Sequence, residues 1–454
     1  MYDGVPAQPG GERCNVSRVH ERVVFLALVV TSAGSLAAQP FNCSISSGVP
    51  PLVRSESLKE RAGDVVLLCV GGTATPAGVP VPQVDIRAFL NTNLTSRLLG
   101  GFNEALLLID EPFPANQHLC EPAPCSILGV NPSITPGSGP GVNYQAAGVP
   151  NVFQGIPVTG TPNAVEWRSV PLDQPGLGTT RIARLTNIYA NAALLGVSTT
   201  LIPTQILIFV TMSVVGGNPA PINNPTQSVA FVLPSLSFSV TGATPCANGS
   251  RTATLNFIER YPTALTRRSD SLDPTVLAAQ NLPGVIYSTQ TGFYHPSLVT
   301  QMGLVPANHA REAGAASWGT RLMAIFGGIP LGGSVTVGTL NNGATGRVPF
   351  GHQAELHNGR AAATFSPATS GALPVSGGGE ALAIWEVTAD SPIAAQNYAF
   401  NVTLSCTAGT PTIVLGGFAP YYSPHSRPPL GRMGMAIDDP VGPRFQQNLT
   451  KVVF

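Results

Sequence analysis

Several segments of the chain alternate apolar and polar residues with a period of two, and this pattern constrains the fold most. The clearest segment is YAFNVTLSC at 398–406, where Tyr398, Phe400 and Val402 alternate with small or polar residues. A β-strand with one buried face requires this period, because successive side chains point to opposite sides. No segment keeps a helical period over three turns, so the sequence predicts an all-β protein.

Other segments with strand character are separated by Gly, Pro and Asn, and the chain holds 49 Gly and 43 Pro. Frequent turns between short strands favour β-sandwiches or jelly rolls over a closed barrel. The predicted strands, besides 398–406, are 84–90, 252–257, 64–71, 105–110, 164–172, 180–191, 204–215, 228–240, 320–327, 334–340 and 380–388.

A length of 454 residues exceeds what one core needs, so we expect two tandem β-sandwich or jelly-roll-like domains. The boundary is predicted near residue 240. The expected segments are domain 1 at 38–240, a long Gly/Pro/Asn-rich insertion inside it at 126–162, domain 2 at 241–425, and a Pro/Gly-rich C-terminal extension at 426–454 that ends in a strand.

The N-terminal segment 1–37 has the features of a secretory signal peptide. Arginines precede a short apolar run, RVVFLALVV, and Ser35 and Ala37 provide small residues for cleavage. The run is short for a membrane span. An alternative stays open, in which the same run is a buried strand of the mature protein.

Cysteine content fits an oxidising compartment. Cys14 lies in the predicted leader, which leaves an even number of cysteines for disulfides. Position along the chain favours the pairs Cys43–Cys69, Cys120–Cys125 and Cys246–Cys406. The first of these bonds has two possible forms, within one chain or between neighbouring subunits.

The charge balance argues against nucleic acid and anionic membranes as partners. Only 10% of the residues are charged, Lys+Arg equals Asp+Glu at 23 each, and no basic run occurs. The expected partner is a second copy of the chain, and glycans are a further candidate.

No motif identifies a reaction, and the sequence predicts neither an enzyme nor a cofactor. In GHQAELHNG at 351–359, a strand would place Glu355 and His357 on one face and His352 on the other, so we expect a solvated turn and no metal site. The acidic pairs at 270/273 and 438/439 lack calcium-loop spacing. QPGLGTTR at 174–181 lacks the Lys of a phosphate loop.

Glycosylation is a second hypothesis for a secreted chain. On the 398–406 strand the acceptor Asn401 is predicted to face outward, where a glycan is tolerated. The Asn-X-Ser/Thr candidates are Asn42, Asn93, Asn248, Asn401 and Asn448.

Several motifs resemble a known group. GDVVLLCVGGT (63–73), NTNLTSRLL (91–99), ALLLIDEP (105–112) and LIPTQILIFV (201–210), with LNFIERYPTAL (255–265), are similar to stretches of uncharacterised secreted bacterial β-sandwich proteins. The resemblance implies an extracellular structural or fibril-forming protein that assembles in a pilus-like way. It carries no catalytic residues.

The C-terminal segment suggests how such an assembly would form. A Pro/Gly-rich linker delivers RFQQNLTKVVF, and exposed sandwich edges accept added strands. We expect residues 444–454 to insert into an adjacent subunit with Phe445, Leu449 and Val453 facing its core. The alternatives are a tail that folds back on its own domain and donation of the N-terminal segment 38–46.

The leading function is therefore a structural subunit of a secreted or cell-surface filament or surface layer, assembled by strand donation. The alternative is a monomeric carbohydrate-binding or adhesion module, and an extracellular hydrolase is third. A lectin-like groove needs exposed aromatics, but Trp385 falls inside a predicted strand and is expected in the core.

Overall fold

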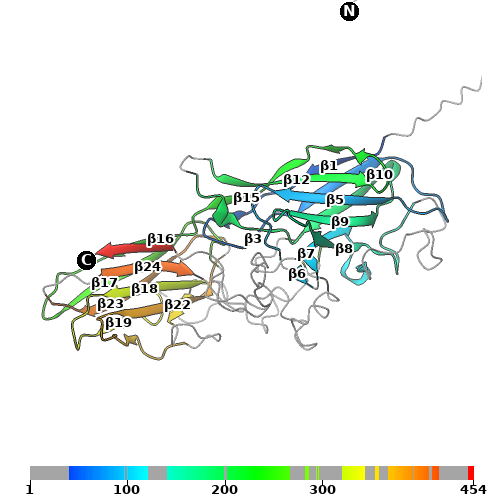
Figure 1. The fold of residues 1–454 in the computed structure, drawn as a ribbon. Coiled ribbons are helices and arrows are strands. Elements are labelled where there is room, and N and C mark those ends of the chain that lie inside the picture. The colour runs from blue at the N-terminus through cyan, green and yellow to red at the C-terminus, as the bar shows by residue number, and fades with distance from the viewer. Residues whose placement is uncertain are drawn as a thin grey trace, which may run out of the picture. The chain divides into compact units, whose positions relative to one another are not determined.

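The computed structural model has an all-β fold, as the sequence predicts (Figure 1). Its two short 3-10 helices in the described residues are η1 (Pro114–Asn116) and η3 (Ala192–Leu194). No helix in this described part is long and apolar enough to cross a membrane. The structure describes residues 40–96, 98–99, 101–120, 141–198, 202–265, 282–285, 293, 295, 320–342, 353–356, 367–391, 393–407, 412–418 and 448–453.

The first sandwich is a 13-stranded sheet with the path β14-β1-β4-β10-β7-β8-β9-β5-β12-β15-β2, to which β13 and β6 add at β12 and β7. A small separate sheet pairs β3 (Glu60–Arg61) with β11 (Tyr189–Ala190). The strands of the large sheet are β1 (Asn42–Ser46), β2 (Leu52–Arg54), β4 (Val65–Gly71), β5 (Gln83–Leu90), β6 (Leu98–Leu99), β7 (Phe102–Ile109), β8 (Val152–Pro157), β9 (Ala164–Pro171), β10 (Gly176–Thr186), β12 (Thr204–Val214), β13 (Pro219–Ala220), β14 (Ile222–Asn223) and β15 (Thr226–Leu233).

Strand β8 connects the two halves of this sheet. Its first residues pair with β7, and its last two, Ile156 and Pro157, pair with β9. Leu67 of β4, Ile86 of β5 and Trp167 of β9 belong to one buried cluster. The two halves therefore pack over a shared apolar core, as in a β-sandwich.

The second sandwich consists of two 5-stranded sheets, β16-β17-β23-β19-β21 and β20-β22-β18-β24-β25. The strands are β16 (Leu236–Thr241), β17 (Ser250–Glu259), β18 (Arg321–Gly327), β19 (Val335–Val337), β20 (Gln353–Leu356), β21 (Ala372–Leu373), β22 (Ala381–Ala389), β23 (Asn397–Ser405), β24 (Thr412–Phe418) and β25 (Asn448–Val453).

Aromatic rings fill the core of the second sandwich. Trp385 of β22 stacks on Phe400 of β23 with ring centroids 4.1 Å apart, and Phe257 of β17 meets Phe400 edge-on at 6.0 Å. Such pairs add to the free energy gained by burying apolar area. The indole Nε1 of Trp385 donates a hydrogen bond to the Gly338 carbonyl at 2.8 Å. The predicted core position of Trp385 is confirmed.

Two of the predicted disulfides are confirmed, Cys43–Cys69 and Cys246–Cys406. Cys43 and Cys69 face each other in the antiparallel register of β1 and β4, so their bond lies within one chain. Cys120 is also disulfide-bonded, and its predicted partner, Cys125, lies outside the described residues.

The main differences from the predicted strands have local causes. The predicted strand 228–240 is two strands, β15 and β16, with Pro234 between them. Because β16 pairs with β17, the change from the first set of sheets to the second falls a few residues before 240. Within the predicted insertion 126–162, residues 152–157 form β8, where Gly155 approaches β9 so closely that a Cβ would lie 2.5 Å from Val165.

Removing the disulfide that joins distant parts of the second sandwich should lower stability. The double variant Cys246→Ser/Cys406→Ser opens a loop with a sequence separation of 160. We expect the free energy of unfolding to fall by about 2–5 kcal/mol, because the unfolded chain regains conformational freedom. Guanidinium denaturation of both proteins measures this difference. An unchanged midpoint and slope would contradict the prediction.

Candidate functional site

The most developed polar site in the described residues lies at one end of the first sandwich, where β7 ends. Asp110 and Glu111 follow β7 with positive φ angles of 58° and 49°. Non-glycine residues rarely adopt this conformation, so the turn must be held by its contacts. The two carboxylates bind Arg181 and Arg184 of β10. We name Asp110, Glu111, Asp173, Arg181 and Arg184 the arginine corner.

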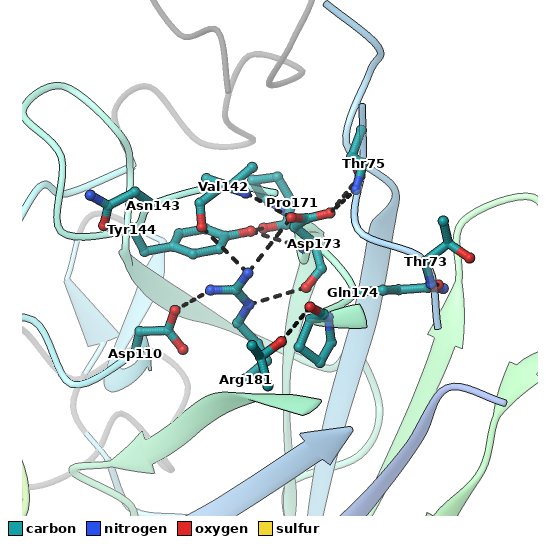
Figure 2. A network of polar contacts seen from close by, with 12 residues as sticks. Thr73, Thr75, Asp110, Val142, Asn143, Tyr144, Pro171, Asp173, Gln174 and Arg181 are labelled. Carbon is teal, nitrogen blue, oxygen red and sulfur yellow. Dashed lines mark hydrogen bonds and ion pairs between the residues drawn. The ribbon is translucent and has the colours of Figure 1, made fainter. Parts of the chain in front are cut away.

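Asp173 of the arginine corner is buried. Figure 2 shows it between Thr75 and Arg181. Its carboxylate accepts hydrogen bonds from the Thr75 backbone N–H at 2.9 Å and from the Thr75 hydroxyl at 2.5 Å. It also accepts from the Val142 N–H at 2.7 Å, and the Arg181 guanidinium lies 3.6 Å away. A buried carboxylate needs such partners, because leaving water costs free energy unless charge and hydrogen bonds compensate it.

Tyr144 closes the site on its other side. Its hydroxyl donates to the Pro171 carbonyl at 2.6 Å and accepts from the Asp173 N–H at 2.9 Å. The Arg181 guanidinium lies over the Tyr144 ring, 4.6 Å from its centroid, which is a favourable cation–π geometry. Burial raises the pKa of the Tyr144 hydroxyl, and the charge of Arg181 opposes this. The phenol therefore stays protonated and keeps its donor role.

Arg184 connects Glu111 to Asp64 at the outer part of the arginine corner. It makes three hydrogen bonds to the Glu111 carboxylate at 2.6–3.0 Å and one to Asp64 at 3.2 Å. Thr186 donates to the other oxygen of Asp64 at 2.8 Å. Burial raises the pKa of the Asp64 carboxyl, while Thr186 and Arg184 lower it.

These contacts give the arginine corner the chemistry of an anchor. The Asp173 carboxylate is bound by backbone and side-chain groups of the protein itself, and its partners come from the segments around Thr75, Val142 and β10. Asn151 extends the anchor, because its amide donates to the carbonyls of Tyr144 and Asn116 at 2.7 Å. The site therefore fixes residues 141–151 against the end of the sheet.

The sequence did not single out the residues of this corner. Asp110 and Glu111 stood in the motif ALLLIDEP and Arg181 ended the rejected phosphate-loop motif QPGLGTTR, while the partners of Asp173 lie up to 98 positions away. The acidic pair directly after an apolar strand was the one available signal.

The metal-candidate segment differs from its prediction. Glu355 is buried in β20, opposite Glu386 of β22, and accepts a hydrogen bond from Gln353 at 3.2 Å. The predicted solvated turn is wrong for residues 353–356, because this segment pairs with β22. His352, His357 and the acids at 270, 273, 438 and 439 lie outside the described residues. Across the described chain, no cluster of three His, Cys, Asp or Glu is placed to hold a metal.

The glycosylation candidates occupy different environments. Asn93, Asn248 and Asn401 are exposed, and Asn248 lies in a turn with a φ of 52°. Asn42 is half-buried in β1 with an unpaired Oδ1. Asn448 begins β25. Modification of these residues stays a prediction.

Comparisons with known proteins identify no family. No family model and no curated protein matches the chain. Among solved structures, it is similar to the C-terminal domain of the Streptococcus agalactiae AgI/II polypeptide BspA, with a TM-score of 0.32, 7% identity, and coverage of 91% of this chain and 99% of that one.

Two other similar structures are also streptococcal. The C-terminal domain of the Streptococcus pyogenes antigen I/II-family protein AspA has a TM-score of 0.27 and 8% identity, with 84% and 95% of the chains covered. The serine-rich repeat adhesion glycoprotein Srr1 of Streptococcus agalactiae has a TM-score of 0.19 and 10% identity, with 83% and 92% covered. TM-scores of this size do not establish a shared fold.

Replacing Tyr144 by Phe tests the anchoring role. The ring over Arg181 is kept, but the Asp173 N–H and the Pro171 carbonyl lose their partner. We expect the free energy of unfolding to fall by about 1–3 kcal/mol, because buried polar groups are left unpaired. Urea unfolding followed by fluorescence measures the change. A difference within experimental error would show that water replaces the hydroxyl or that the site does not anchor the loop.

Another buried carboxylate, Glu259, lies at the end of β17. Its oxygens accept hydrogen bonds from the N–H groups of Leu265 at 3.1 Å and Gln396 at 3.0 Å. Burial, followed by the nearby Asp390, raises the pKa of Glu259 to about 7. Asp390 in turn accepts a hydrogen bond from the Tyr398 hydroxyl at 2.8 Å.

The raised pKa of Glu259 predicts a loss of stability with rising pH. The unfolded chain releases this proton near the ordinary value of 4.5, and the folded chain holds it until about 7. The contribution is therefore fully present below pH 4.5 and is lost as the pH rises towards 7. Between pH 4.5 and 7, the free energy of unfolding of the wild type should fall relative to that of the Glu259→Gln variant. Thermal melts from pH 4.5 to 8 test it, and parallel curves for the two proteins would contradict it.

Proposed function

We propose that the chain is a structural subunit of an extracellular filament or surface layer, and that neighbouring subunits exchange strand β25. The observation that carries the proposal is the position of β25. It is the edge strand of its sheet and pairs only with β24 among the described strands. An edge contact made within one chain is also available between chains, which is the basis of strand swapping.

In the single chain the terminal strand folds back on its own sandwich, the alternative that the sequence left open. Residues 448–453 pair with residues 412–417 in antiparallel register, with Leu449 opposite Gly416 and Val453 opposite Thr412. Phe445 lies outside the described residues. The intervening segment 419–447 has a fully extended reach of roughly 95 Å, which allows the same pairing with a neighbour.

The rival donor, β1, is held differently. It pairs with β4 and β14, and the Cys43–Cys69 disulfide fixes it covalently to β4. Exchange of β1 would require reduction of a bond between two buried cysteines. This difference favours β25 as the exchanged strand.

The disulfides also support an extracellular location. Disulfides persist in oxidising compartments and are rare in the cytosol. The role needs no catalytic residue or cofactor, which agrees with a polar site built for anchoring.

The proposal is tested by mixing two variants that each carry one cysteine added to the native ones, Leu415→Cys and Thr450→Cys. These positions face each other in the β24–β25 register. A disulfide between two different chains forms efficiently only if β25 of one pairs with β24 of the other. We expect a covalent heterodimer on a non-reducing gel when the mixture is brought to conditions in which the wild type assembles.

The matched control replaces Thr450→Cys by Lys451→Cys, the next position along β25, which the register pairs with Val414 and not with Leu415. This mixture should give little heterodimer. Deletion of residues 444–454 should abolish fibres seen by negative-stain microscopy. Equal cross-linking in both mixtures, or normal fibres from the folded truncated protein, would refute strand exchange by β25.

A further inference from the structure

One face of the second sandwich carries hydroxyl and amide groups without charge. It is the outer face of the β16-β17-β23-β19 sheet, opposite the aromatic core. None of the outward positions described on these strands is charged. We name it the hydroxyl–amide face; its residues are Ser237, Ser239, Thr241, Ser250, Thr252, Thr254, Asn256, Ile258, Thr336, Asn397, Ala399, Asn401, Thr403 and Ser405.

The register aligns these residues in rows across the strands. One row runs Thr336, Thr403 and Thr252, and the next contains Asn401, Thr254 and Thr241. Neighbouring strands lie about 4.8 Å apart, so each row is a line of polar groups at that spacing. Thr252, Thr336 and Thr403 are exposed, and Asn401 beside them is exposed as well.

Hydrogen bonds within the face fix the orientation of several groups. The Asn401 Oδ1 accepts from the Thr254 hydroxyl and from the Asn342 amide, both at 3.0 Å. The Asn256 amide donates to the Thr241 hydroxyl at 2.9 Å. Groups held in this way lose less conformational entropy when a ligand binds.

We propose that the hydroxyl–amide face binds a neutral polysaccharide. Sugar hydroxyls donate and accept hydrogen bonds, as Ser, Thr and Asn side chains do. Binding a charged partner would take its charge out of water against a face that offers no opposite charge. A neutral partner avoids this cost. The described residues of this face include no aromatic side chain of the kind that lines a lectin-like groove, so apolar contact to the C–H groups of a sugar ring falls to Ile258, its exposed large aliphatic residue. The proposal does not depend on strand exchange.

A second copy of the chain fits this face less well. Stable protein interfaces usually have an apolar, aromatic-rich centre, and electrostatic complementarity selects the partner. The hydroxyl–amide face offers Ile258 alone as a large apolar side chain among its described residues, and no charge. Its chemistry therefore matches a hydroxyl-rich neutral chain better than a protein surface.

Affinity electrophoresis tests this proposal with the full chain, produced in a host without N-glycosylation so that Asn401 stays unmodified. Native gels contain dextran, mannan or hydroxyethylcellulose, and alginate serves as the anionic comparison. We expect at least one neutral polysaccharide to slow migration relative to a polysaccharide-free gel, and alginate not to. The variant Thr252→Glu/Thr403→Glu should lose the retardation.

The charge-matched control is Thr180→Glu/Thr226→Glu, which places two carboxylates at exposed positions of the first sandwich and should keep the retardation. Because opposed Glu residues destabilise a sheet, Thr252→Ala/Thr403→Ala provides a milder variant that should weaken binding, and thermal melts verify folding.

Unretarded migration of wild type in all three neutral gels would overturn the proposal. So would retardation of the folded Thr252→Glu/Thr403→Glu variant equal to that of wild type. Self-association that this variant abolishes, without any polysaccharide effect, would assign the face to a second copy instead.

Discussion

Where a strand buries only one face, a register slip of one residue would move its whole apolar set into water. Strand β23 shows the consequence. The register that buries Phe400 against Trp385 also places Asn401 and Thr403 in rows with Thr254 and Thr252 on the outer surface. The core therefore determines the outer surface chemistry, because inner and outer residues alternate along one backbone. A surface of hydroxyls and amides in fixed rows is a product of the packing beneath it.

A different constraint, the need to pair polar groups, applies at the end of the first sandwich. There the chain leaves the sheet, and backbone groups of the loop need partners that strands no longer supply. Asp173 accepts two backbone N–H bonds, and the Tyr144 hydroxyl serves one N–H and one carbonyl. Arg181 forms ion pairs with both Asp173 and Asp110. These polar groups are hydrogen-bonded to one another in a network. A single substitution is therefore expected to change stability by more than the loss of one hydrogen bond.

Strands with clean alternation, such as β17, β23 and β5, could be predicted from sequence because period-two patterning reports burial directly. Strand β8 could not, because Gly155 and Pro157 usually mark turns, whereas here Gly155 permits close packing on β9. The turn predicted around Glu355 was wrong for a related reason. The flanking glycines indicate a turn, and the sequence alone does not show that this segment pairs with β22. The disulfides Cys43–Cys69 and Cys246–Cys406 were predictable from the positions of the cysteines along the chain. The arginine corner was not, since Thr75 and Asp173 meet only through the fold.

The Cys43–Cys69 bond also decides how the molecule carries mechanical load. Tension applied from the N-terminal side reaches Cys43 near the start of β1 and passes through a covalent bond into β4, which pairs on its other side with β10. The hydrogen bonds between β1 and β4 are thereby shielded from that force. The β24–β25 pairing has no such covalent support among the described residues, so a load applied through β25 acts directly on the backbone hydrogen bonds of that pairing. Strands β1 and β25 would therefore transmit tension by different means, the first through a covalent bond and the second through a strand pairing.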